Sequence, residues 1–270
     1  MDNPEIGHIV SINGIETNIH LSGDGEPVLL IHGSGPGVSA YANWRKVLPE
    51  LSQNFYTLAP DMVGFGYSSK LNQPFELSAF VNHLLSILDH FEIPQVSLIG
   101  NSFGGALALH LAKQCPNRVK RLILMGSVGS RFALTEGLDA VWGYQPSISN
   151  MRHLLDIFAF SRELVTDELA ELRYNASIRE GVQESFSAMF PAPRQRWIDA
   201  MALTDEELMS ISCPSLLVHG INDQVIPITC SKHLDKTLPN SELLIFEQCG
   251  HWVQIEKADE FTRAVKDFIY

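Results

Sequence analysis

A serine flanked by glycines follows a short apolar run in the first half of the chain. It lies in the segment GNSFG over residues 100–104, between the apolar run Val96–Ile99 and the helix-prone segment Ala106–Lys113. A strand-to-helix turn of this kind is tight, and side chains at the two glycine positions would clash with the neighbouring strand and helix. The turn exposes the hydroxyl of Ser102 at a helix N-terminus, where backbone N–H groups favour a developing negative charge. The pattern predicts a nucleophilic serine, although glycine-rich turns also occur in non-catalytic doubly wound proteins.

An aspartate and a histidine occur later in the chain, each just beyond a predicted strand. Asp223 follows the apolar segment SLLVH at 215–219, and His251 follows the run Leu243–Phe246. The carboxyl ends of parallel strands meet at one edge of a sheet, where open α/β sheets hold their sites. The chain order Ser, Asp, His is that of the α/β hydrolases. We therefore expect His251 to carry protons for Ser102, and Asp223 to orient and stabilise the charged imidazole.

A glycine-rich loop supplies the remaining part of such a site. The segment HGSGPG at 32–37 directly follows the strand-like run Val28–Ile31. Glycines allow the backbone to approach a substrate closely and to present N–H donors to an oxyanion. We expect these donors to be the N–H groups of Ser34 and of Phe103, the residue after the nucleophile. His32 is expected to brace this loop.

Composition limits the kinds of partner. The 270 residues fit one α/β domain with an insertion, and a formal net charge of −12 argues against nucleic acid or an anionic membrane. The four cysteines form no CxxC pair, so we expect reduced thiols. The N-terminal residues Met1–Glu5 lack the features of a signal peptide, so we expect a cytoplasmic protein. The ten histidines show no HxH or HExxH spacing, and we expect neither a metal nor another cofactor.

The periodicity predicts an α/β fold with a mostly parallel, twisted sheet flanked by helices. Asn13-Gly14 predicts an antiparallel hairpin at the start, and the later short apolar runs fit strands buried on both faces of the sheet. The final helix is expected over Ala258–Ile269. Strand patterns stop after Met125 and helical ones predominate. We therefore expect an α/β core of residues 1–128 and 205–270 and a helical cap, or lid, of residues 129–204.

Segments from both expected parts of the chain resemble one known family. They are HGSGPGVSAYANW (32–44), PDMVGFGYS (60–68), GNSFGG (100–105), EGLDAVWGY (136–144), LVTDELAELRY (164–174), MFPAPRQRW (189–197) and QCGHW (248–252). Together they resemble the meta-cleavage product hydrolases, which are carbon–carbon bond hydrolases of bacterial aromatic catabolism with an α/β-hydrolase fold. The resemblance covers nearly the whole chain. It is strongest to the branch that acts on ring-opened phenols, catechol and alkylbenzenes.

The resemblance assigns roles to particular residues. It implies the same triad and oxyanion donors, together with polar substrate contacts from Asn43 and Asn101, a carboxylate-binding Arg173 and an aromatic wall from Trp252. Without the resemblance, Asn43 and Asn101 would be interpreted as turn-stabilising residues. Arg173 would be interpreted as a salt-bridge residue near Glu168 and Glu171.

The implied substrate is a small anionic 2-hydroxy-6-oxo-hexa-2,4-dienoate, such as 2-hydroxymuconate semialdehyde or a small-alkyl analogue. Hydrolysis of its C5–C6 bond gives 2-hydroxypenta-2,4-dienoate and a small carboxylic acid. The sequence is compatible both with an acyl-enzyme on Ser102 and with a water that Ser102 activates. Val128, Ile198 and Ile226 are expected to narrow the acyl side of the pocket. The family also implies a homodimer.

Two alternative functions remain at this stage. A carboxylesterase or lactonase would use the same Ser-His-Asp triad. A non-catalytic ligand receptor on the same fold is disfavoured by the intact triad.

Overall fold

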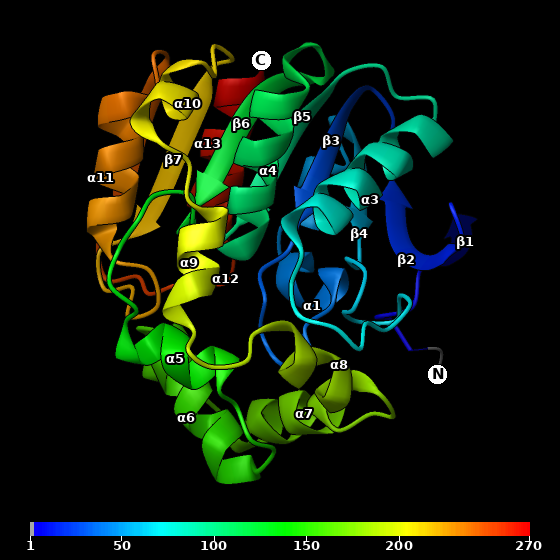
Figure 1. Ribbon diagram of the computed structural model, residues 1–270, viewed down its shortest axis with the longest axis vertical. Coiled ribbons are helices and arrows are strands. Elements are labelled where there is room, and N and C mark those ends of the chain that lie inside the picture. Colours follow the sequence, from blue (N-terminus) through cyan, green and yellow to red (C-terminus); the bar gives the residue numbers. More distant parts are fainter. Residues whose placement is uncertain (1–2) are drawn as a thin grey trace.

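The computed structural model describes residues 3–270, and its centre is an eight-stranded sheet of order β1-β2-β4-β3-β5-β6-β7-β8 (Figure 1). β2 pairs antiparallel with β1 and β4, and all other pairs are parallel. This confirms the expected mostly parallel sheet. The strands are β1 (His8–Ile12), β2 (Ile15–Ser22), β3 (Glu26–Ile31), β4 (Phe55–Pro60), β5 (Val96–Asn101), β6 (Val119–Met125), β7 (Ser215–Gly220) and β8 (Ser241–Phe246).

Two sequence expectations for the sheet can be compared directly with the strands. The hairpin at Asn13-Gly14 is confirmed, and both residues have positive φ, of 50° and 80°, as a tight two-residue turn requires. The expectation that all later strands are buried on both faces is wrong for β8. Its residues are only partly buried or exposed, because β8 is an edge strand that pairs with β7 alone.

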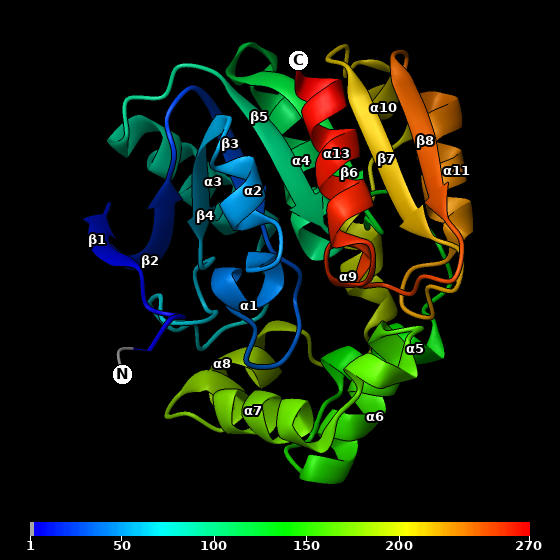
Figure 2. The same ribbon diagram turned by 180° about the vertical axis from the view of Figure 1, so that it is seen from behind.

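Helices cover both faces of the sheet and separate its core into two layers. On one face, the core layer that includes Leu29 and Ile31 is covered by α3 (Leu77–His90), α4 (Phe103–Gln114) and α11 (Ile228–Thr237). On the other face, Val28 and Leu30 pack in a second layer. Its helices are α1 (Ala40–Trp44), α2 (Leu48–Leu51), α12 (Val253–Glu256) and α13 (Ala258–Ile269), and Figure 2 shows α1, α2 and α13 on this face of the sheet. The alternation of neighbouring β3 residues between the layers follows from the two-residue period of a strand.

The segment between β6 and β7 is wholly described and contains helices without a strand. The helices are α5 (Glu136–Trp142), α6 (Ile148–Phe158), α7 (Asp167–Ser177), α8 (Val182–Met189), α9 (Gln195–Met201) and α10 (Asp205–Met209). Two 3-10 turns, Pro116–Arg118 and Arg162–Leu164, complete the helical elements. Helices α5–α8 lie beyond the carboxyl ends of the strands, and α9 leads back toward the sheet (Figure 1). Within residues 3–270, none of the helices has the length and apolar character needed to cross a bilayer.

Candidate active site

The turn between β5 and α4 holds Ser102 in an unusual backbone conformation, with φ 54° and ψ −113°. A Cβ on Gly100 would lie 2.6 Å from the carbonyl oxygen of Gly104, and one on Gly104 would lie 2.2 Å from that of Ile31. Both glycines are therefore required by close packing of the turn against the helix and β3. The Ser102 N–H donates to the Met125 carbonyl at 2.9 Å, which fixes the turn against the end of β6.

Asp223 and His251 meet beyond the ends of β7 and β8. The His251 Nδ1–H donates to Asp223 Oδ2 at 2.7 Å, and Asp223 Oδ1 accepts the N–H groups of Val225 and Ile226 at 2.7 and 3.0 Å. Burial alone would raise the pKa of Asp223, but the charge and hydrogen bond of His251 hold it below its ordinary value. Asp223 is therefore ionised, and it fixes the imidazole tautomer that leaves Nε2 free to take a proton.

A second histidine, His219, lies behind Asp223 and was not anticipated from the sequence. Its Nε2–H donates to the Ile226 carbonyl at 3.0 Å and lies 3.6 Å from Asp223 Oδ2, while Nδ1 accepts from the Ser231 hydroxyl at 2.8 Å. Burial lowers the pKa of His219, although Asp223 opposes this shift. A neutral His219 therefore supports the loop that carries Asp223.

The loop after β3 approaches the nucleophile turn and is internally braced. His32 donates from Nδ1 to the Gly33 carbonyl at 2.7 Å and accepts the Met62 N–H on Nε2 at 2.9 Å. This confirms its expected bracing role. Within residues 3–270, the N–H groups of Ser34 and Phe103 have no acceptor. The Ser34 hydroxyl accepts from the indole N–H of Trp142 at 2.9 Å, which links the loop to α5.

A cavity of about 320 Å³ opens beside these groups. Seven of the residues expected at the site line it, namely Ser34, Asn43, Asn101, Ser102, Arg173, His251 and Trp252. Asp223 lies behind His251 rather than in the wall. The Phe103 side chain is fully buried in the core, so only its backbone can serve the site.

The apolar wall of the cavity differs from the sequence expectation. Val128, Ile198 and Ile226 are fully buried and are not among the lining residues. Val128 instead donates its N–H to the Ser102 carbonyl at 3.1 Å. The expected acyl wall is therefore wrong. The apolar residues that line the cavity include Leu138, Val141, Met151, Leu155, Phe158 and Val225.

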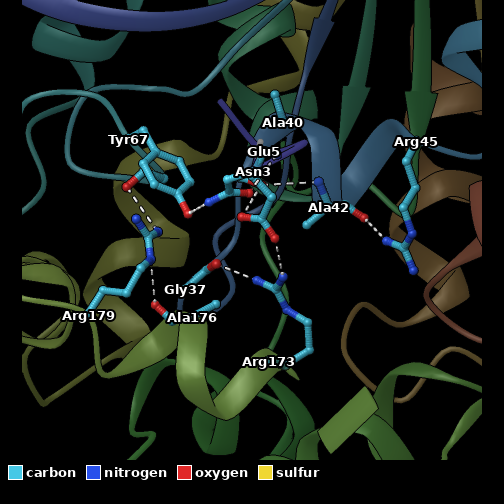
Figure 3. Close-up of polar contacts among 12 residues, drawn as sticks. Asn3, Glu5, Gly37, Ala40, Ala42, Arg45, Tyr67, Arg173, Ala176 and Arg179 are labelled. Carbon is cyan, nitrogen blue, oxygen red and sulfur yellow. Dashed lines mark hydrogen bonds and ion pairs between the residues drawn. The ribbon is translucent and has the colours of Figure 1, made fainter. Parts of the chain in front are cut away.

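Arg173 enters the cavity from α7 and is held by the N-terminal segment (Figure 3). Its Nη1 lies 3.2 Å from Glu5 Oε1, and its Nη2 donates to the Gly37 carbonyl. Burial lowers the pKa of the guanidinium, and Glu5 opposes this shift. The partner is Glu5 rather than the nearby Glu168 or Glu171. Glu5 is itself oriented by the Ser39 hydroxyl, which donates to Oε2 at 2.9 Å.

Comparisons with known proteins show the family to which the chain belongs. The family model described as "alpha/beta hydrolase fold" matches residues 26–258. The chain is 54% identical over 268 residues to a 2-hydroxy-6-oxo-2,4-heptadienoate hydrolase of Pseudomonas putida, covering 99% of this chain and 97% of that protein. It is 54% identical over 269 residues to a 2-hydroxymuconate semialdehyde hydrolase of Pseudomonas sp. strain CF600, covering 99% and 95% of the two chains. The chain belongs to the meta-cleavage product hydrolases.

A solved structure extends this likeness to three dimensions. The meta-cleavage product hydrolase CumD of Pseudomonas fluorescens IP01, as a serine-to-alanine variant complexed with acetates, superimposes with a TM-score of 0.97. The two are 53% identical, and the match covers 99% of this chain and 98% of that one. The present chain is accordingly a serine hydrolase of the α/β-hydrolase fold.

The hydrolase places its polar and aromatic cavity groups on different elements. Asn101, at the end of β5, donates from Nδ2 to the Met125 carbonyl at 3.3 Å. Asn43, on α1, is nearly buried, and its Nδ2 has no partner in the described part of the chain. Trp252, in the loop after β8, stacks on Phe158 of α6 with ring centroids 5.0 Å apart. The two rings form a flat aromatic surface. The site therefore combines polar groups with a planar apolar wall.

Proposed function

We propose that this protein hydrolyses the C5–C6 bond of a 2-hydroxy-6-oxo-hexa-2,4-dienoate that carries hydrogen or a small alkyl group at C6. The products are 2-hydroxypenta-2,4-dienoate and a small carboxylic acid, in meta-cleavage degradation of aromatic compounds. The observation that carries the proposal is a single cavity that holds Ser102 and His251 together with a buried arginine, Arg173. The activities printed in the names of the two relatives above support it.

The substrate fits the distribution of polar groups in the cavity. The guanidinium of Arg173 presents a planar set of donors that suits a carboxylate. Two of these donors are engaged by Glu5 and Gly37, and others remain for the ligand. Asn43 and Asn101 hydrogen-bond the carboxylate and 2-hydroxyl end. The conjugated chain is planar and lies against Trp252.

The reaction begins with a proton transfer and ends with bond cleavage. His251 transfers the proton of the 2-hydroxyl group to C5, which converts the dienol to its keto form. A nucleophile, either the Ser102 oxygen or a water that Ser102 activates, then adds to the C6 carbonyl. The N–H groups of Ser34 and Phe103 stabilise the resulting oxyanion. Collapse of the adduct breaks C5–C6, the electron pair leaves with C5 as a dienolate, and water supplies the oxygen of the released acid.

The helical segment is proposed to act as a cap over this chemistry. Residues 129–204 form the cap, and residues 1–128 and 205–270 form the core. A cap excludes water and thereby strengthens the electrostatic interactions within the cavity. We also propose that the enzyme is a cytoplasmic homodimer, as the family resemblance implies.

The proposal is tested with purified protein and four dienoates whose C6 carbonyl carries hydrogen, methyl, isopropyl or phenyl. Loss of the yellow dienoate absorbance is followed with the wild type and with Ser102→Ala. Rapid bleaching by the wild type and none by the variant is the expected result. If no dienoate is bleached while a simple aryl ester is cleaved, the carbon–carbon hydrolase is wrong and the protein is an esterase.

A further inference from the structure

Gln254 is a buried polar residue of the cavity wall whose amide has no hydrogen-bond partner. It lies on α12, its side chain is fully buried, and it lines the same cavity as Ser102. Neither Nε2 nor Oε1 has a partner within residues 3–270. Native proteins pair nearly all buried amide groups, because leaving them unpaired is unfavourable. An apolar residue of similar size would fill this position without that penalty.

The neighbouring helix carries a second unpaired amide. Helices α1 and α12 contact one another, and Asn43 Nδ2 on α1 is also buried without a partner in residues 3–270. Both residues line the cavity, as do the cationic side chains of Arg45 and Arg173. Two contacting helices therefore carry unpaired buried amides in the wall of one cavity that Arg45 and Arg173 also line. This combination suits an anionic ligand that also carries a hydroxyl group.

We infer that Gln254 binds the 2-hydroxy-carboxylate end of the substrate, an inference that rests on the proposed function. A primary amide presents a donor and an acceptor side by side. A 2-hydroxyl group next to a carboxylate oxygen presents the complementary acceptor and donor. Gln254 thus accepts from the 2-hydroxyl on Oε1 and donates to the carboxylate from Nε2. Asn43 supplies a further donor from the adjacent helix.

The first test replaces the amide by an apolar group of similar volume, Gln254→Met. We expect KM for the dienoate to rise about 10- to 100-fold, because two hydrogen bonds to the ligand are lost, one of them to a charged group. Hydrolysis of 4-nitrophenyl acetate, which has neither a carboxylate nor a 2-hydroxyl, should be much less affected than hydrolysis of the dienoate. The melting temperature should stay equal or rise, because two unpaired buried atoms are removed. A purely structural role for Gln254 predicts a lower melting temperature and an unchanged KM, which would overturn the inference.

A second variant provides a signature that packing alone does not give. In Gln254→Glu the ionised carboxylate repels the substrate, whereas the protonated form again offers a donor and an acceptor. The ratio of KM between this variant and the wild type should therefore fall as the pH is lowered. A ratio that does not change with pH, in a folded variant, would contradict the inference.

The same assays provide a control variant and distinguish failure of this inference from failure of the proposed function. Gln114→Met changes an exposed glutamine at the end of α4 that does not line the cavity, and it should leave both substrates unaffected. Dienoate binding in Ser102→Ala, with and without Gln254→Met, gives the affinity without turnover. A wild type that bleaches dienoates while Gln254→Met binds them within twofold of normal would overturn only this inference. A wild type that neither binds nor cleaves dienoates would overturn both.

Discussion

The backbone of Ser102 should be strained, and substitution can measure that strain. Its φ of 54° and ψ of −113° resemble the first central position of a type II′ turn, which glycine dominates. A non-glycine residue in such a region costs about 1–3 kcal/mol. Glycine carries an opposing cost of about 0.4–1 kcal/mol, since it is more flexible in the unfolded chain. We expect Ser102→Gly to be about 0.5–2 kcal/mol more stable than Ser102→Ala, which keeps the Cβ and the strain.

This free energy is measurable as a shift in melting temperature. For 270 residues the entropy of unfolding is about 0.6 kcal/mol per degree, so the expected difference is about 1–4 °C. Both variants should lose turnover. Ser102→Gly should therefore be inactive although it is more stable than Ser102→Ala. The assay is differential scanning calorimetry of the two variants side by side.

Ser97 provides the matched control because it is a buried serine on the same strand, β5. It is absent from the positive-φ residues of the described chain, so glycine there gains nothing from relief of strain. Ser97→Gly should therefore be less stable than Ser97→Ala by about 0.5–1 kcal/mol. If Ser102→Gly is also no more stable than Ser102→Ala, the nucleophile turn is not strained and the reasoning fails.

Three further predictions concern charge. Burial lowers the pKa of His83 to about 4 from 6.5, so the unfolded chain binds the extra proton first and stability falls as the pH drops through this range. Between pH 8 and pH 5 this titration lowers the free energy of unfolding by about 2 kcal/mol. The free energy of unfolding of His83→Gln, measured with urea, should lack this decrease. An identical pH dependence in the variant and the wild type would refute the assignment. Arg173→Lys should raise KM for dienoates about tenfold or more, with aryl ester hydrolysis retained, because lysine lacks the planar set of donors; equal KM values would exclude carboxylate binding. Arg45 and the exposed Lys46 line the cavity of a protein of net charge −12, so added salt should lower kcat/KM for the anionic dienoate. The dependence of kcat/KM on salt concentration should become weaker when Arg45 and Lys46 are both replaced by Gln. An unchanged salt dependence would rule out electrostatic steering by these residues.

Local patterns were sufficient wherever the physics is local. Asn13-Gly14 predicted the hairpin because two consecutive positive φ values suit few other residue pairs. The apolar stripe of Ala258–Ile269 predicted α13 with its observed bounds. The glycines around Ser102 predicted a close-packed turn, since each contact that excludes a Cβ involves the next helix or the adjacent strand.

Contacts between distant segments could not be predicted in this way. Glu5 and His219 have no periodic pattern that points to their partners, and each becomes part of the site only through tertiary packing. The acyl wall failed for a related reason. Val128 and Ile226 lie near site residues in the sequence, but proximity along the chain does not fix the direction of a side chain. In the folded protein both are fully buried and neither lines the cavity.

The ion pair between Glu5 and Arg173 joins residues that are 168 positions apart in the chain. The Glu5 carbonyl also accepts from Asn18 on β2 at 2.9 Å, so the N-terminal segment is anchored to the sheet while it holds a residue of α7. Attachment of this segment and binding of a substrate carboxylate act on the same guanidinium, and thermodynamic linkage makes each alter the free energy of the other. Occupancy of the cavity should therefore be visible in the amide hydrogen exchange of residues 3–7. A peptide fused ahead of these residues should therefore alter the affinity of the cavity for its substrate.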